Sequence, residues 1–125
     1  MAENVMRLLD RIPAVYAAND SLMRRARRAR LTFLLEADQV GRLVTLDCGR
    51  LAIRAVSGPM DGWDFALRAK SEAWMDHWKE MPSPDASDIL GMARYGRMRI
   101  EGNFLPLMQH LQIVKDIVAL PRCAA

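Results

Sequence analysis

The stretch GMARYGRMRIEGNFLPLMQHLQIVKDIV, residues 91–118, decides the fold, because the spacing of its apolar residues changes partway along. Met98 and Ile100 alternate with charged residues, which predicts a short strand over Gly96–Glu101. From Phe104 onward, apolar residues recur every three to four positions, which predicts one long closing helix over 104–120. The stretch carries no paired catalytic motif, no metal-ligand cluster and no phosphate loop. Its apolar surface is therefore the feature that needs a function.

Upstream of this stretch, strict alternation of apolar and polar residues predicts four more strands. The first begins at Leu31, where the period changes from helical to two. Residues 42–56 form a hairpin around the tight turn DCGR, and residues 63–70 form the next strand, with one dry and one wet face. Helical spacing predicts a helix over 3–19 that Pro13 breaks, a basic helix over 20–28, and a helix beginning at Ser71 that carries two tryptophans.

The predicted order is helices, four strands, two helices, one strand and a closing helix. Strands that are grouped together rather than alternating with helices indicate an α+β fold, with a five-stranded, mainly antiparallel sheet covered by helices. A length of 125 residues suits a single domain. Within it we expect an N-terminal helical extension over residues 1–30 and a core over residues 31–120.

Composition excludes several classes of protein. The net charge of +3 is too small to make nucleic-acid binding the default. Cys48 and Cys123 lie far apart and form no CxxC motif, so a zinc site or disulfide framework is not expected and a reducing cytoplasm fits best. No apolar run is long enough to span a bilayer, and the N-terminus lacks the apolar core of a signal peptide.

The two histidines do not form a site with any neighbouring motif. His77 follows Asp76 on a predicted helix, where adjacent side chains point about 100° apart, and we expect His77 to be exposed. His110 has no metal-ligand spacing to His77, and no serine or cysteine sits in a nucleophile motif. We therefore expect no enzymatic activity, no catalytic residue, no metal and no cofactor.

One charge cluster stands out, the segment RRARRAR in which Arg24, Arg25, Arg27, Arg28 and Arg30 follow one another with no acid between them. The simplest interpretation is a solvated helix face. Contact with an anionic membrane surface or an acidic partner is the second. Nucleic acid is the weakest, because few aromatic residues and no recognition motif accompany the arginines.

Several of these segments resemble the sterol carrier protein 2 domain family. The resemblance is carried by the hairpin TLDCGRLAIRA and by the consecutive segments FALRAKSEAWMDHWKEM, DASDILGMARYGRMRIEGN and FLPLMQHLQIVKDIVAL. They are similar to that family's second and third strands, its aromatic-bearing helix, its glycine-flanked short strand and its closing helix. The resemblance covers roughly residues 31–120, whereas the N-terminal 30 residues and the absence of a peroxisomal ending depart from the family pattern.

The resemblance implies a sheet with helices over one face, enclosing an apolar tunnel for a sterol, a fatty acyl chain or another lipid. The nine methionines point the same way, because thioethers adapt to varied apolar shapes, although the same residues also suit an ordinary core. The residues expected to line the ligand site are Phe65, Leu67, Trp74, Trp78, Met98, Ile100, Phe104, Leu107, Met108 and Leu111.

The leading hypothesis is therefore non-enzymatic binding or transfer of a hydrophobic ligand. The alternative is an accessory or protein-interaction subunit that keeps the fold, has filled its cavity, and acts as a homodimer or with an enzyme partner. The expected partners under the leading hypothesis are a lipid or other hydrophobic small molecule and, peripherally, an anionic membrane.

Overall fold

The structure, a computed structural model, describes residues 2–56, 58 and 62–124 and contains one five-stranded sheet in the order β3-β2-β1-β4-β5. The strands are β1 (Arg30–Ala37), β2 (Val40–Asp47), β3 (Arg50–Ala55), β4 (Phe65–Ala69) and β5 (Met98–Gly102). Only the central pair, β1 and β4, runs parallel, and the other three pairs are antiparallel. This arrangement confirms the predicted α+β class and the mainly antiparallel sheet.

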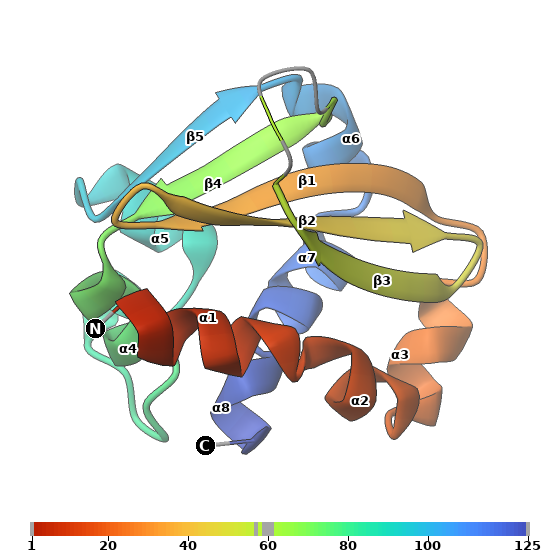
Figure 1. Ribbon diagram of the computed structural model, residues 1–125, viewed down its shortest axis with the longest axis horizontal. Coiled ribbons are helices and arrows are strands. Elements are labelled where there is room, and N and C mark those ends of the chain that lie inside the picture. The colour runs from red at the N-terminus through yellow and green to blue at the C-terminus, as the bar shows by residue number, and fades with distance from the viewer. Residues whose placement is uncertain (1, 57, 59–61, 125) are drawn as a thin grey trace.

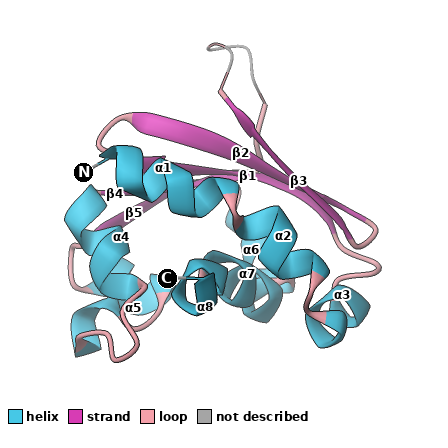
Figure 2. Ribbon diagram, turned by 60° about the horizontal axis from the view of Figure 1, so that its bottom comes forward, coloured by secondary structure: helices cyan, strands magenta, loops and turns pink. Residues whose placement is uncertain are grey.

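The helices gather on one side of the sheet and leave the other side without a helical layer (Figures 1 and 2). In chain order they are α1 (Ala2–Asp10), α2 (Ile12–Ala17), α3 (Asp20–Arg25), α4 (Ser71–His77), the short 3₁₀ helix η1 (Pro84–Ala86), α5 (Ile89–Arg94), α6 (Phe104–Gln109), α7 (Leu111–Val118) and α8 (Leu120–Ala124). The hydrophobic core therefore lies between one sheet face and this helical layer.

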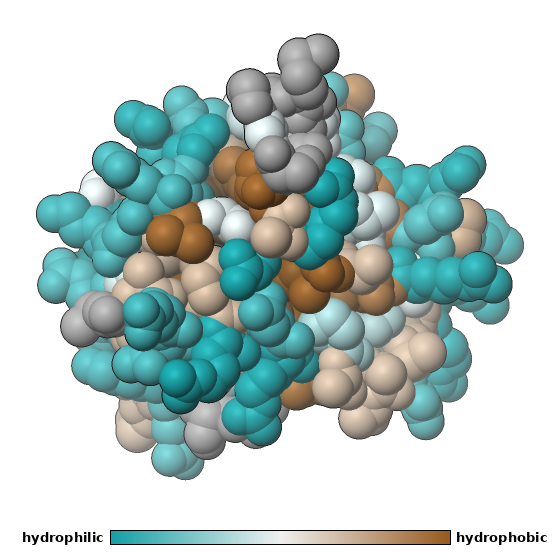
Figure 3. All heavy atoms as spheres, viewed as in Figure 1, coloured by the Kyte–Doolittle hydropathy of each residue, from teal (hydrophilic) through white to brown (hydrophobic). Residues whose placement is uncertain are grey.

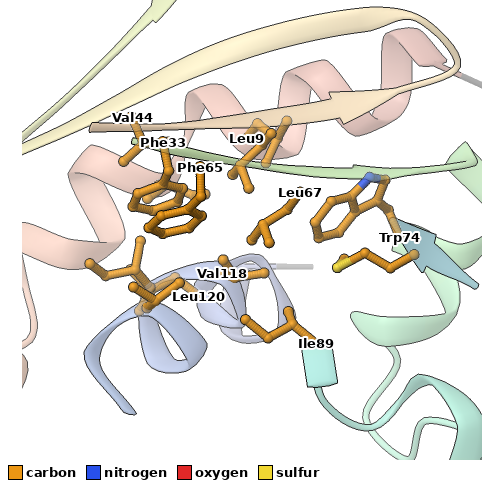
Figure 4. Packing of buried hydrophobic residues seen from close by; sticks show 14 of the residues in the cluster. Leu9, Phe33, Val44, Phe65, Leu67, Trp74, Ile89, Val118 and Leu120 are labelled. Carbon is orange, nitrogen blue, oxygen red and sulfur yellow. The ribbon is translucent and has the colours of Figure 1, made fainter. Parts of the chain in front are cut away.

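Alternation along the strands sends one set of side chains into that core. Phe33 of β1 and Phe65 of β4 are direct partners in the parallel register, and their rings stack with centroids 5.1 Å apart. Leu35 and Leu67, two positions along, are likewise partners and fully buried. Figure 4 shows these sheet residues pointing toward apolar side chains from the helices.

The N-terminal helices pack into the same core as the rest of the chain. Val5 and Leu9 of α1 and Ile12 of α2 are fully buried, and the Tyr16 hydroxyl donates to the carbonyl of Gly49 at 2.7 Å. The predicted interruption near Pro13 is confirmed, because α1 ends at Asp10 and proline occupies the first turn of α2.

The predicted closing helix over 104–120 is wrong, because the structure has three shorter helices there. Asn103 caps α6, with its side chain accepting from the Leu105 amide at 3.1 Å. The helix then ends at His110, whose backbone angles, φ −123° and ψ 29°, lie outside the helical region, and a second interruption follows at Ala119. On the two sides of the first break, α6 buries Leu107, and α7 buries Val114, Ile117 and Val118. The basic helix is also shorter than predicted and ends at Arg25.

The sheet face without helices carries its own small cluster and an ion-pair network. Leu34, Leu43 and Ala66 are buried there, with Trp63 packed against them. The Arg68 guanidinium pairs with Glu36 and Glu101 on the two neighbouring strands. On the face of the molecule seen in Figure 3, hydrophilic residues occupy most of the rim and hydrophobic residues show only in small patches.

Gly102, where β5 turns into α6, allows a close backbone approach that no other residue permits. Its φ is +100°, and a Cβ built there would lie 2.7 Å from the carbonyl oxygen of Asp64. We expect Gly102→Ala to lower the free energy of unfolding by about 2–5 kcal/mol, the sum of left-handed strain and a clash with backbone.

Gly96→Ala is the matched control, since Gly96 has a φ of +76° and open space where its Cβ would be. We expect it to lose only the strain, about 1–2 kcal/mol. Urea denaturation of both variants measures the difference, and equal losses would show that the contact with Asp64 does not constrain the turn.

Candidate functional site

The ten residues predicted to line a ligand site fall into three settings. Phe65, Leu67, Met98, Trp74, Trp78 and Leu107 are buried in the core. Ile100 and Leu111 are partly buried and pack against it. Phe104 and Met108 are half exposed, at 49% and 50%. The first two groups lie in or beside the interior between sheet and helices, whereas the last two face solvent.

Phe104 and Met108 were expected to face the dry side of the sheet together with Leu107, and that part of the prediction is wrong. Because α6 is only one and a half turns long and stops at His110, it turns a single residue, Leu107, fully inward. The side chains of Phe104, Leu105 and Met108 on the same helix stay largely in solvent.

Trp74 and Trp78 fix α4 at the opposite end of the helical layer from α6. Their rings stack 5.6 Å apart, and each buried indole N–H finds a backbone acceptor. Trp74 donates to the carbonyl of Glu36 on β1, and Trp78 donates to the carbonyl of Val118 at the end of α7, both at 2.9 Å. These hydrogen bonds join α4 to the sheet and to α7, so α4 is held in place on two sides.

The interior between these elements is occupied by packed side chains in the structure. Figure 4 shows the stacked Phe33 and Phe65 meeting Val118 and Leu120 from the helices, with Ile89 and Trp74 closing the same cluster. Two methionines, Met92 and Met98, are part of this packing. A ligand in this position would therefore have to displace side chains or helices.

The structure also has surface hollows that were not predicted, and one of them is lined by many charged residues. This hollow, of about 410 Å³, lies where β1 and β4 end and β5 begins, and its wall includes Asp38, Arg68, Lys70, Arg97 and Arg99. Its charges are largely engaged in ion pairs, such as Arg97 with Asp76 at 2.6 Å. That bond holds the pKa of the Asp76 carboxyl down to about 2.

His77 is buried, at 2% exposure, so the expectation of an exposed histidine is wrong. It follows Trp74 by three positions, and that helical spacing is the signal that could have placed it inside. Its Nδ1 lies 2.7 Å from the carbonyl of Ala86, which can only accept, so Nδ1 carries the proton. Its Nε2 has no partner among the residues that the structure describes.

Hydrogen bonds and burial both tie His77 into the packing of the helical layer. Burial lowers the pKa of His77, opposed by the bond to Ala86. Its carbonyl accepts from Arg122 of α8, so the residue also helps to hold the C-terminal helix. Over residues 2–56, 58 and 62–124, no group of three or more His, Cys, Asp or Glu residues could hold a metal ion.

The predicted arginine cluster lies on α3 and the turn that leads into β1, and all five side chains are exposed. Arg25 pairs with Asp116 of α7 at 2.8 Å and Arg30 pairs with Asp47 at 3.1 Å. Arg24, Arg27 and Arg28 form no ion pair with any described residue. Among all the residues that the structure describes, no helix is long and apolar enough to cross a membrane.

Burial of His77 predicts that the protein loses stability as pH falls below about 6.5. The unfolded chain binds a proton at its ordinary pKa near 6.5, whereas the folded state resists protonation, so the unfolded state binds more protons and is stabilised relative to the folded state as pH falls. The slope is at most about 1.4 kcal/mol per pH unit and ends where the folded pKa is reached. Urea midpoints between pH 7.5 and pH 5 measure this decline, and His77→Gln should flatten it. An unchanged slope in that variant would contradict the assignment.

No family model and no curated protein matches the sequence, but solved structures do. A crystal structure of sterol carrier protein 2 matches 93% of this chain and 94% of its own, with 16% identity and a TM-score of 0.71. The ubiquinone synthesis protein UbiJ-SCP2 matches 94% of this chain and 82% of its own, with 16% identity and a TM-score of 0.50. The sec-alkylsulfatase Pisa1 from a Pseudomonas species matches 73% of this chain over 14% of its own, with 15% identity and a TM-score of 0.54. At these identities the likeness concerns architecture, and the chain has the fold of sterol carrier protein 2.

Proposed function

We propose that the protein binds or transfers a hydrophobic ligand, such as a sterol, a fatty acyl chain or another lipid, without catalysing a reaction on it. The ligand would lie between the inner face of the sheet and the helices α6 and α7. The fold shared with sterol carrier protein 2 supports hydrophobic-ligand binding in general.

The observation that carries this proposal is the way in which α6 closes the interior. This helix has six residues, between the cap residue Asn103 and the break at His110. It contributes one buried side chain, Leu107, to the core. A helix held by one apolar side chain can move aside at small cost, because exposing a single leucine to water costs about 1.5–3 kcal/mol. Displacing α6 would give an apolar chain access to Phe65 and Leu67 behind it.

The absence of catalysis is part of the proposal and rests on the two histidines. General acid–base catalysis needs a side chain within hydrogen-bond reach of the substrate. His77 is 2% exposed and its unpaired Nε2 is buried, so a substrate would have to enter the core to reach the ring. His110 stands at the break between α6 and α7, with no side-chain hydrogen bond described.

Leu107→Trp tests whether Leu107 lies beside the space that the ligand occupies. We expect the parent protein to take up a fluorescent fatty acid saturably and Leu107→Trp to take up at least tenfold less, because the indole fills the space that the acyl chain needs. Met108→Trp is the matched control: it adds the same ring to the neighbouring, half-exposed position and should change uptake less than about twofold. Overpacking is expected to cost the first variant about 1–3 kcal/mol, so urea denaturation must show that it remains folded. A parent without saturable uptake, or equal uptake by Leu107→Trp, would contradict the proposal.

Native mass spectrometry of the purified protein separates the proposal from the accessory-subunit alternative. We expect an adduct of several hundred daltons that solvent extraction removes. Adding the extracted molecule back should raise the melting temperature, since a ligand at 100 times its Kd stabilises the folded state by about 2.7 kcal/mol. A ligand-free protein that instead retains a second subunit would favour the alternative.

A further inference from the structure

The exposed side of α6 is an apolar patch on a surface that is otherwise mainly polar. Leu105 is 61% exposed, and Phe104 and Met108 are about half exposed. Spacings of three and four residues make these side chains neighbours on the helix. Single exposed hydrophobic residues are ordinary, but three large ones together mark an interaction surface. We call Phe104, Leu105 and Met108 the apolar tip.

The apolar tip lies at the same end of the sheet as the arginine cluster. The Asn103 amide, next to the tip, donates to the carbonyl of Asp64 at 2.7 Å. The Asp64 carboxylate accepts from the Thr32 amide at 2.9 Å, and Thr32 is two residues from Arg30. The α3 helix also packs against α7, which follows α6 directly, and both α3 and α6 lie in the right half of Figure 1.

Charge at this end favours an anionic partner. All five arginines are exposed, and two of them are neutralised by Asp116 and Asp47. The other three, Arg24, Arg27 and Arg28, carry charge that no described carboxylate compensates. A second copy of this chain is a poor occupant, because a twofold contact through this end would bring two arginine clusters together.

We propose that this end of the molecule docks on an anionic phospholipid bilayer. Protruding apolar side chains suit a fluid interface, where Phe104, Leu105 and Met108 would enter the boundary between headgroups and acyl chains. The exposed arginines would lie against lipid phosphates, which they bind bidentately or by long-range attraction. Docking needs no bound ligand, so it goes beyond the proposed function. A further consequence does rest on the proposed function: docking would draw α6, with Leu107, out of the core and so allow the protein to exchange its ligand with the bilayer.

Vesicle flotation tests the docking with ligand-free protein. We expect binding to vesicles of phosphatidylcholine with about 30% phosphatidylserine and little to phosphatidylcholine alone. Binding should weaken as salt rises past 0.1 M, where the screening length is about 10 Å. Because no fatty acid is present, failure here leaves the uptake experiment unaffected, and failure of uptake leaves this result unaffected.

Two pairs of variants locate the docking surface. Leu105→Ser should weaken binding about tenfold, whereas Met81→Ser, at an 88% exposed methionine beyond α4, should leave it unchanged. Arg27→Gln with Arg28→Gln should weaken binding roughly 25-fold, at about fivefold per arginine. The charge-matched control is Arg94→Gln with Arg99→Gln, on α5 and β5 at the other end of the sheet.

Three results would overturn the proposal. The first is a parent protein that does not float with anionic vesicles at low salt. The second is equal weakening by the control variants, which would show diffuse attraction without a docking face. The third is a stable dimer in sedimentation equilibrium that Leu105→Ser dissociates, together with no vesicle binding, which would make the apolar tip a protein interface.

Discussion

The rest of the fold depends on the hydrogen bonds that Asp64 makes to Thr32 and Asn103. The Asp64 carboxylate accepts from the Thr32 amide, its own amide donates to the Thr32 carbonyl at 2.7 Å, and its carbonyl accepts from Asn103. Two segments distant in sequence, at Thr32 and at Asn103, are thereby fixed to Asp64. The parallel register of β1 and β4 follows, and with it the alignment that stacks Phe33 on Phe65. The direction in which the chain leaves β5 for α6 also follows, since only a residue without a Cβ fits beside the Asp64 carbonyl.

The two ends of the sheet differ in how firmly the helices are attached. Where β1 and β4 finish, Trp74 bonds to Glu36, and Asp38 accepts from the Ser71 amide at 3.2 Å. The Asp76–Arg97 pair adds a charge-assisted bond between α4 and the segment leading into β5. At the other end, α6 contributes Leu107 alone to the core. Opening of α6 therefore exposes less buried surface than opening of α4, and segments that open at low free energy are often the ones used for binding.

The strands could be predicted from sequence because successive side chains of a strand point to opposite faces of the sheet, which leaves an alternation of apolar and polar residues. The breaks in the closing segment could not, because Phe104, Leu107, Met108 and Leu111 keep perfect helical spacing on both sides of His110. Which of them turns inward is decided by tertiary packing that overrides local propensity. The arginine cluster was visible in the sequence, whereas the apolar tip was not, since its residues were assigned to the ligand site. His77 was misplaced because its polarity outweighed its position between two tryptophans of the same stripe.

Packing the interior with side chains stabilises a protein of this size when no ligand is bound. Ligand pockets generally measure at least about 300 Å³, and an empty apolar cavity costs about 24 cal/mol per Å³. Keeping such a cavity open would cost about 7 kcal/mol, comparable with the whole stability of a typical domain, about 5–15 kcal/mol. A chain of 125 residues therefore gains by closing the space with mobile apolar groups when no ligand is present. Met92 and Met98 suit that role because unbranched side chains repack at low cost. If the protein binds a ligand as proposed, opening accompanies binding, and α6, which places Leu107 alone in the core beside an apolar, basic surface, is where the two events can be coupled.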